Sequence, residues 1–206
     1  MEYANGGDSF EYVRKKGGLQ ENEARWFFQQ LIVALDYCHR KGVVNRDVKL
    51  ENTLIHWAQK PLLKICDFGY SKDEKYQSAP ASRVGTPAYL APEVILNKKG
   101  ETYNGKQADV WSCGVMLFVT LVGQYPFERP DDKGDPQKLH KMIRRIVHVD
   151  YQFPSRVSVS EGCQVCRPLA FLNTVGFGLG LLNFVRTNSN TQPLFQETPS
   201  NCKTLV

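Results

Sequence analysis

Carboxylate, amide and ammonium side chains recur at short spacings in the first half of the chain. Asn52 and Asp67 carry oxygen donors of the kind that Mg²⁺ prefers. Lys49, two residues after Asp47, can place a compact positive charge against a phosphate. These residue types point to phosphate chemistry with magnesium. They belong to a set of three short segments: Asn-Arg-Asp-Val-Lys-Leu-Glu-Asn at 45–52, Asp-Phe-Gly at 67–69 and Ala-Pro-Glu at 91–93.

The three segments resemble, in order, the catalytic loop, the metal-binding turn and the end of the activation segment of eukaryotic protein kinases. A lone Asp-Phe-Gly occurs by chance, but all three in order, with a loop of the right length between the last two, are specific. The lysine after Asp47 and Gly-Thr-Pro-Ala-Tyr at 85–89 resemble the serine/threonine branch. The resemblance covers about residues 1–163. It implies an α+β fold, the mainly helical C-terminal lobe of a kinase, with the small lobe missing.

The resemblance assigns a role to each residue of the catalytic set. Asp47 would accept the proton of a substrate hydroxyl, and Asn52 and Asp67 would bind the Mg²⁺ that accompanies ATP. Lys49 would reach the transferring phosphate, and Thr86 would hydrogen-bond near Asp47 and Lys49. A single Asp or Lys would ordinarily be a solvated surface charge, but their joint spacing argues against that interpretation.

The first eight residues resemble the hinge that holds the adenine of ATP in kinases. Backbone groups of Glu2 and Ala4 would face the adenine, and Leu54 would form the floor of its pocket. Asp8 stands where the family usually has a glutamate near the ribose. Glu51 is assigned to the same nucleotide-binding set, and its carboxylate would help to read a basic residue in the substrate.

Finer matches at 64–72, 84–89 and 103–106 narrow the resemblance to plant Snf-related kinases activated by osmotic stress and abscisic acid. By that resemblance Ser82 matches the activating phosphorylation site. A phosphate adds about two negative charges and can pair with arginine, and Arg46 is the expected partner. The alternative is that Ser82 is simply a small loop residue. The implied partners are protein substrates with serine or threonine acceptors and an upstream activating kinase or phosphatase.

The chain departs from the family pattern at three places. Asn45 replaces the usual histidine before the catalytic aspartate, and we expect some loss of rigidity without loss of the base. Glu93 would lack the arginine that pairs with it in the family. Asp109, by contrast, follows the family and would hold the backbone of the catalytic loop from a buried helix. These 206 residues contain no glycine-rich nucleotide loop or Val-Ala-x-Lys strand before the hinge. Gly-Phe-Gly-Leu-Gly at 176–180 has the wrong spacing to replace that loop.

Two functions therefore stay open. The first is a serine/threonine kinase that does not phosphorylate efficiently as this chain alone, since the family also needs the lysine–glutamate pair of the small lobe. The second is a non-catalytic, kinase-like binding module that keeps the substrate face.

The elements that must position these residues are mainly helical. Apolar residues at three-and-four spacing predict a helix over 21–41, and residues 107–122 are apolar nearly all round, which is typical of a core helix. Proline at a favoured first helical position predicts a further helix over 136–148. Short apolar runs predict strands at 43–44, 53–55 and 62–66, and residues 70–92 predict a long functional loop.

Composition excludes several other classes of protein. The net charge of +5 comes without a basic stripe, so we expect no nucleic-acid partner. Cys38, Cys66 and Cys113 lie in apolar runs, and the pair Cys163 and Cys166 has no second pair to complete a zinc site. No signal peptide is visible at the start. Together these features predict a reducing, cytoplasmic or nuclear location.

Residues 164–206 differ in character from the rest. Only four of the 47 charged residues lie there, and no amphipathic pattern is visible, so we predict a divergent, poorly ordered tail. The alternative of a membrane anchor at 169–185 is disfavoured, because this run has 17 residues with three polar ones, whereas a spanning helix needs about 20 mainly apolar residues.

Overall fold

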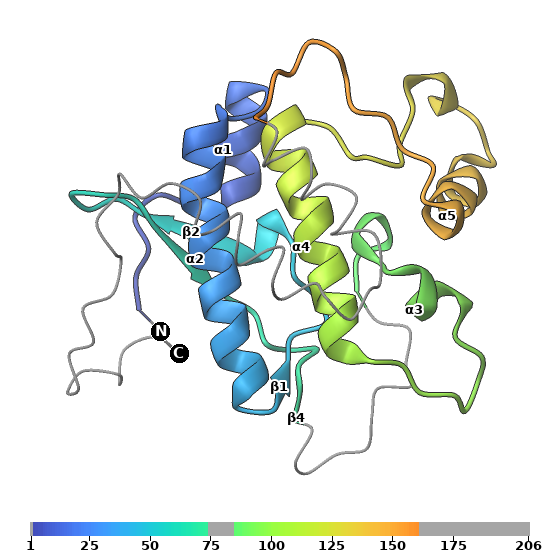
Figure 1. The fold of residues 1–206 in the computed structure, drawn as a ribbon, viewed down its shortest axis with the longest axis horizontal. Helices are drawn as coiled ribbons and strands as arrows, with labels where there is room; N and C mark the ends of the chain where they lie inside the picture. The colour runs from blue at the N-terminus through green and yellow to red at the C-terminus, as the bar shows by residue number, and fades with distance from the viewer. Residues whose placement is uncertain (1, 74–84, 161–206) are drawn as a thin grey trace.

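Two long helices form the centre of the fold. In the computed structural model, which describes residues 2–73 and 85–160, α2 and α4 lie side by side (Figure 1). The β2–β3 pair packs against α2, while α3 and α5 contact each other on the opposite side of α4. The described elements are α1 (Ser9–Lys16), α2 (Glu21–Arg40), β1 (Val43–Val44), β2 (Thr53–His56), β3 (Leu62–Ile65), β4 (Lys72–Asp73), α3 (Pro92–Leu96), α4 (Gly105–Val122) and α5 (Lys138–His148), with 3₁₀ turns at Leu50–Asn52, Pro87–Tyr89 and Pro130–Asp132.

Helix α2 confirms the helix predicted over 21–41. Glutamates in its first turn and basic residues in its last turn complement the helix dipole. Its buried side chains are all apolar and recur at three-and-four spacing, which places one stripe of the helix against the core. They are Ala24, Phe27, Phe28, Leu31 and Leu35.

Helix α4 is the core helix that its composition predicts. Most of its side chains are buried, and Trp111 stacks on Phe127 with ring centres 5.8 Å apart. It begins two residues earlier than predicted, because the Asn104 side chain accepts a hydrogen bond from Gln107 N at 3.2 Å. It ends at Gly123, whose φ is 73°. A Cβ there would lie 2.6 Å from the carbonyl carbon of Gly17, so glycine allows α1 and α4 to end against each other.

The strands form two antiparallel pairs. In the β2–β3 pair, Leu54 lies opposite Lys64, as the predicted runs at 53–55 and 62–66 allow. The second pair joins β1 to β4. The prediction of a structureless loop over 70–92 is wrong at both ends, because β4 lies there, and so do the 3₁₀ turn Pro87–Tyr89 and the start of α3. Residues 74–84 lie outside the described chain.

Two helices differ from the sequence predictions. Helix α1 was not predicted, since only Ser9 and Val13 are buried and its apolar pattern is short. Local signals nevertheless delimit it: Asp8 Oδ1 accepts a hydrogen bond from Glu11 N at 2.8 Å, and Gly17 ends the helix with a φ of 66°. Helix α5 ends at His148 as predicted but begins at Lys138, two residues after the expected proline.

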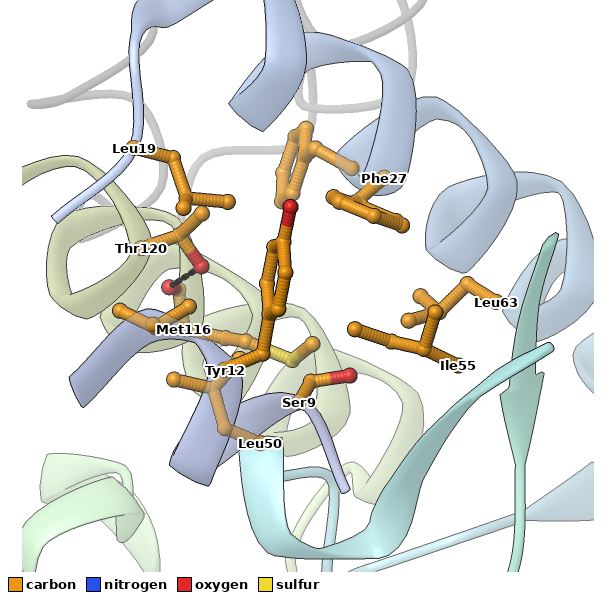
Figure 2. Close-up of a pocket in the computed structure, with 11 residues that line it drawn as sticks. Ser9, Tyr12, Leu19, Phe27, Leu50, Ile55, Leu63, Met116 and Thr120 are labelled. Carbon is orange, nitrogen blue, oxygen red and sulfur yellow. Dashed lines mark hydrogen bonds between the residues drawn. The ribbon is translucent and has the colours of Figure 1, made fainter. Parts of the chain in front are cut away.

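An apolar cavity of about 10 Å³ lies between α1, α2, α4 and β2. Figure 2 shows the Tyr12 ring standing among Leu19, Phe27 and Ile55, with the Thr120 hydroxyl turned back to the carbonyl of Met116. A space of this size holds at most about one water molecule. The nucleotide that the sequence predicts must therefore bind elsewhere.

The predicted tail lies outside the described residues, together with Ser82, the Cys163–Cys166 pair and the run at 169–185. The boundary at residue 163 accordingly stays a prediction. Within the described ranges, no helix is long and apolar enough to cross a membrane.

Candidate active site

A buried carboxylate, Asp47, forms the centre of the predicted catalytic set. Its residue is 6% exposed, and its Oδ2 accepts from Asn52 Nδ2 and pairs with Lys49 Nζ, both at 2.8 Å. Thr86 lies near the end of the predicted activation segment and contacts the same carboxylate. Its hydroxyl donates to Asp47 Oδ1 at 3.3 Å and accepts from Lys49 Nζ at 2.9 Å. The structure thus brings together all four residues assigned to catalysis. Charge-assisted contacts of this kind compensate a buried carboxylate for lost water.

Asp109, on α4, anchors the loop that carries Asp47. Its carboxylate accepts from the backbone N–H of Asn45 at 2.9 Å and of Arg46 at 2.7 Å, which are the contacts that the resemblance implies. His39 Nε2 lies 2.8 Å from the same carboxylate. Three partners satisfy a residue that is only 1% exposed. They also hold Arg46 in a left-handed conformation, with a φ of 67°.

The two residues assigned to magnesium offer oxygen atoms. The side-chain nitrogen of Asn52 donates to Asp47. Its side-chain oxygen accepts no hydrogen bond from a described residue. Asp67 is exposed, has a φ of 60°, and accepts from Gly69 N at 2.9 Å through one carboxylate oxygen. Among the described residues no group of three or more His, Cys, Asp or Glu side chains could hold a metal. Two oxygen ligands fit Mg²⁺, which keeps water and phosphate in its shell.

The predicted hinge runs beside β2 like a further strand. Gly6 N donates to Ile55 O at 2.8 Å, and Ile55 N donates to Gly7 O at 2.9 Å. The Asn5 carboxamide continues this ladder, because it accepts from Trp57 N at 2.7 Å and donates to Trp57 O at 3.3 Å. A Cβ at Gly6 would lie 2.5 Å from Ile55 O, so the close approach requires glycine. Sequence reasoning missed Asn5 and Trp57, whose pairing has no local signal.

The four hinge-side residues assigned to ATP lie along this ladder. Leu54 is half-buried and alternates with the buried Thr53 and Ile55, so it faces the side of β2 away from the core. The Glu2 carboxylate pairs with Lys64 on β3, and Ala4 is half-buried. One carboxylate oxygen of Asp8 caps α1 by accepting from Glu11 N, and the ribose contact stays a prediction.

Glu51 lies between two tyrosine hydroxyls. Tyr89 donates to one carboxylate oxygen at 3.4 Å and Tyr125 to the other at 3.3 Å. Burial raises the pKa of Tyr89 strongly and that of Tyr125 to about 12, so both hydroxyls keep their protons. Because Tyr89 lies near the end of the predicted activation segment, this arrangement favours the substrate-side interpretation of Glu51 over the nucleotide-binding one. Sequence reasoning did not find either tyrosine.

The remaining supporting residues, Arg46 and Glu93, differ in how well they are satisfied. Arg46 Nε donates to Tyr70 O at 2.6 Å. It also opposes the rise that burial causes in the pKa of Tyr103. Its predicted pairing with a phosphate on Ser82 stays a prediction. Both carboxylate oxygens of Glu93 are buried and find no partner among the described residues. That Glu93 lacks the family's arginine throughout the chain stays a prediction.

Comparison with known proteins decides the family. The family described as "Protein kinase domain" matches residues 1–170. The chain belongs to the protein kinase family. This membership is consistent with the resemblance of the segments at 45–52, 67–69 and 91–93 to kinase motifs.

Curated relatives of this kinase chain are plant enzymes. Serine/threonine-protein kinase SRK2H of Arabidopsis thaliana is 55% identical over 164 residues, which is 80% of this chain and 44% of the relative. Serine/threonine-protein kinase SAPK1 of Oryza sativa subsp. japonica is 56% identical over 164 residues, or 80% of this chain and 46% of the relative. The predicted resemblance to plant Snf-related kinases is confirmed. The chain spans less than half the length of these relatives.

Proposed function

We propose that this chain carries the catalytic loop of a protein serine/threonine kinase that transfers the γ-phosphate of ATP to a hydroxyl on a protein. The convergence of Lys49, Asn52 and Thr86 on the buried carboxylate of Asp47 carries the proposal. Two of these partners come from the same loop, but Thr86 is 39 residues away from Asp47. Only a folded site brings this set together.

In the proposed reaction, Asp47 orients the acceptor hydroxyl and takes up its proton. Asn52 holds the Asp47 carboxylate through its amide nitrogen and presents its oxygen, with Asp67, to the metal. Magnesium bound with ATP neutralises phosphate charge. Lys49 lies close enough to Asp47 and Thr86 to bring its positive charge to the transferring phosphate.

We further propose that the described residues form the larger, C-terminal lobe and that residues 1–206 alone transfer phosphate inefficiently. The hinge and the β2 floor offer one wall for a nucleotide, while these residues contain neither the glycine-rich loop nor the lysine that complete a kinase phosphate site. A role in plant stress signalling, control by an upstream kinase or phosphatase at Ser82, and a cytoplasmic or nuclear location rest on the sequence predictions.

The test is a phosphate-transfer assay on purified residues 1–206 with MgATP and a serine-containing protein substrate. We expect a trace of transfer at most, and none after Asp47→Asn. Efficient magnesium-dependent phosphorylation by the wild-type chain would refute the proposal of inefficiency. Transfer that persists in Asp47→Asn at the wild-type rate would refute the role of Asp47.

A binding module is the second candidate, and one observation favours it. The substrate-side group of Glu51, Tyr89 and Tyr125 is complete within the described residues, whereas the phosphate site is not. Such a chain could hold a basic protein segment without modifying it. Titration of an arginine-containing serine peptide would show binding that Glu51→Gln weakens but Asp67→Ala does not.

A further inference from the structure

Asn45, the residue that replaces the family's histidine, is one of the most deeply buried polar residues of the chain. It is 1% exposed. Its backbone nitrogen, side-chain oxygen and side-chain nitrogen each have a different environment. Its backbone N–H donates to Asp109 Oδ2 at 2.9 Å, and its side-chain oxygen accepts from Asp47 N at 3.1 Å. Its side-chain nitrogen is buried and has no partner among the described residues.

The contact to Asp47 closes a local turn. An Asn side chain that accepts from the N–H two residues later mimics a backbone turn and suits a left-handed residue at or near the turn. Arg46, the residue in between, has a φ of 67°. The backbone of the catalytic loop is therefore held from two sides: Asp109 binds the N–H groups of residues 45 and 46, and Asn45 binds that of residue 47.

The orientation of the carboxamide follows from the hydrogen bonds. If its oxygen and nitrogen were exchanged, two donors would face each other at the Asp47 N–H, and that buried group would also lose its partner. The observed orientation leaves one unsatisfied donor instead of two conflicting ones. The unpartnered nitrogen is thus the consequence of holding Asp47.

We propose that Asn45 is a positioning residue for Asp47, acting through the Asp47 backbone N–H rather than through its carboxylate. The functional meaning of this role rests on the proposed kinase function. Asn45→Ala frees the Asp47 N–H and also removes the unsatisfied amide donor. These two changes oppose each other in global stability, so the main effect appears locally at Asp47.

Amide hydrogen exchange followed by NMR on residues 1–206 tests this inference without nucleotide or activity. The reference is the Asn52 amide, which donates to Lys49 O at 3.1 Å in the same loop. In the wild type we expect the Asp47 amide to be protected. Asn45→Ala should accelerate its exchange at least tenfold relative to Asn52. Asn45→Ser, whose hydroxyl makes the same turn more weakly, should give an intermediate ratio.

Asn104→Ala is the matched control, because Asn104 also accepts a backbone N–H through its side-chain oxygen, at the start of α4. It should leave the Asp47-to-Asn52 ratio unchanged. Equal acceleration of both amides in Asn45→Ala would show a merely structural role and overturn the inference. An unprotected Asp47 amide in the wild type would overturn it as well. Because the readout needs no ATP, phosphate transfer that persists in Asp47→Asn would refute the proposed function and leave this test intact.

Discussion

Three buried carboxyl groups of the described chain meet three different environments. Asp47 is balanced by a lysine, an amide and a hydroxyl, and Asp109 by two backbone N–H groups and His39. Glu93 has no hydrogen-bond partner among the described residues. A buried polar group without a partner loses its water without compensation, whereas a satisfied one does not. Glu93 is therefore the residue at which the described fold is least well satisfied.

Replacing the Glu93 carboxyl group by an apolar side chain of similar length should stabilise the chain. Glu93→Met removes the unsatisfied oxygens and keeps most of the volume. We expect the free energy of unfolding, measured by urea denaturation, to rise by about 1–3 kcal/mol.

The exposed Glu101 serves as the control for this substitution. Glu101→Met should change the free energy of unfolding by less than about 0.5 kcal/mol. A loss of stability in Glu93→Met would mean that Glu93 does have a cationic partner in the folded chain, and the expectation from the missing arginine would be wrong.

Sequence reasoning named the candidate site residues that lie close together in the chain or in a known motif. Asp47, Lys49 and Asn52 share one loop, and the resemblance of that loop to the kinase catalytic loop indicated joint chemistry. Partners such as His39 for Asp109, Tyr125 for Glu51 and Trp57 for Asn5 are 52 to 74 residues apart. Only tertiary packing creates these contacts, and no local sequence pattern predicts them.

Helices with a continuous apolar pattern could be predicted, and short elements could not. Residues in α2 and α4 bury side chains over several turns, so periodicity marks them. Helix α1 buries two residues, and β4 consists of two residues that pair with β1 through their backbones. Capping by Asp8 and the stop at Gly17 were the signals available for α1, and they are weak without a buried face.

Helix α5 is joined to the 3₁₀ turn Pro130–Asp132 by an ion pair. Arg145 donates to both carboxylate oxygens of Asp132, at 2.5 and 3.0 Å, and also to Phe127 O at 3.1 Å. The hydrogen bond from Arg145 holds the pKa of Asp132 below its usual value of 3.8. A carboxyl group with a lowered pKa stabilises the fold above its unfolded-state pKa, and this contribution is lost as the pH falls through the folded-state pKa.

Asp132→Asn should therefore lower the urea midpoint at pH 7, and the difference from the wild type should shrink as the pH falls from 5 to 3. Urea denaturation at several pH values measures this difference. Asp131→Asn, at the exposed neighbouring position, should show little difference at any pH. A difference in urea midpoint between the wild type and Asp132→Asn that stays constant down to pH 3 would contradict the assigned ion pair.

At the scale of the whole molecule, the enclosed space in the core is too small for a nucleotide. The core space near Tyr12 has about 10 Å³. The hinge segment instead pairs with β2 through backbone hydrogen bonds, and Leu54 lies on the face of β2 away from the core. Under the proposed function, ATP would bind along the hinge and β2, with its phosphates near Asn52 and Asp67.

Line broadening by Mn²⁺ in the presence of ATP tests this central claim most directly, because NMR detects weak binding and the paramagnetic ion reports its own position. Residues 1–206 should show the strongest broadening at the amides around Asn52 and Asp67. Asp67→Ala should abolish it, and Asp36→Ala, at an exposed site on α2, should not. Broadening scattered over other acidic residues, or unchanged in Asp67→Ala, would contradict the assignment of this face as a kinase nucleotide site.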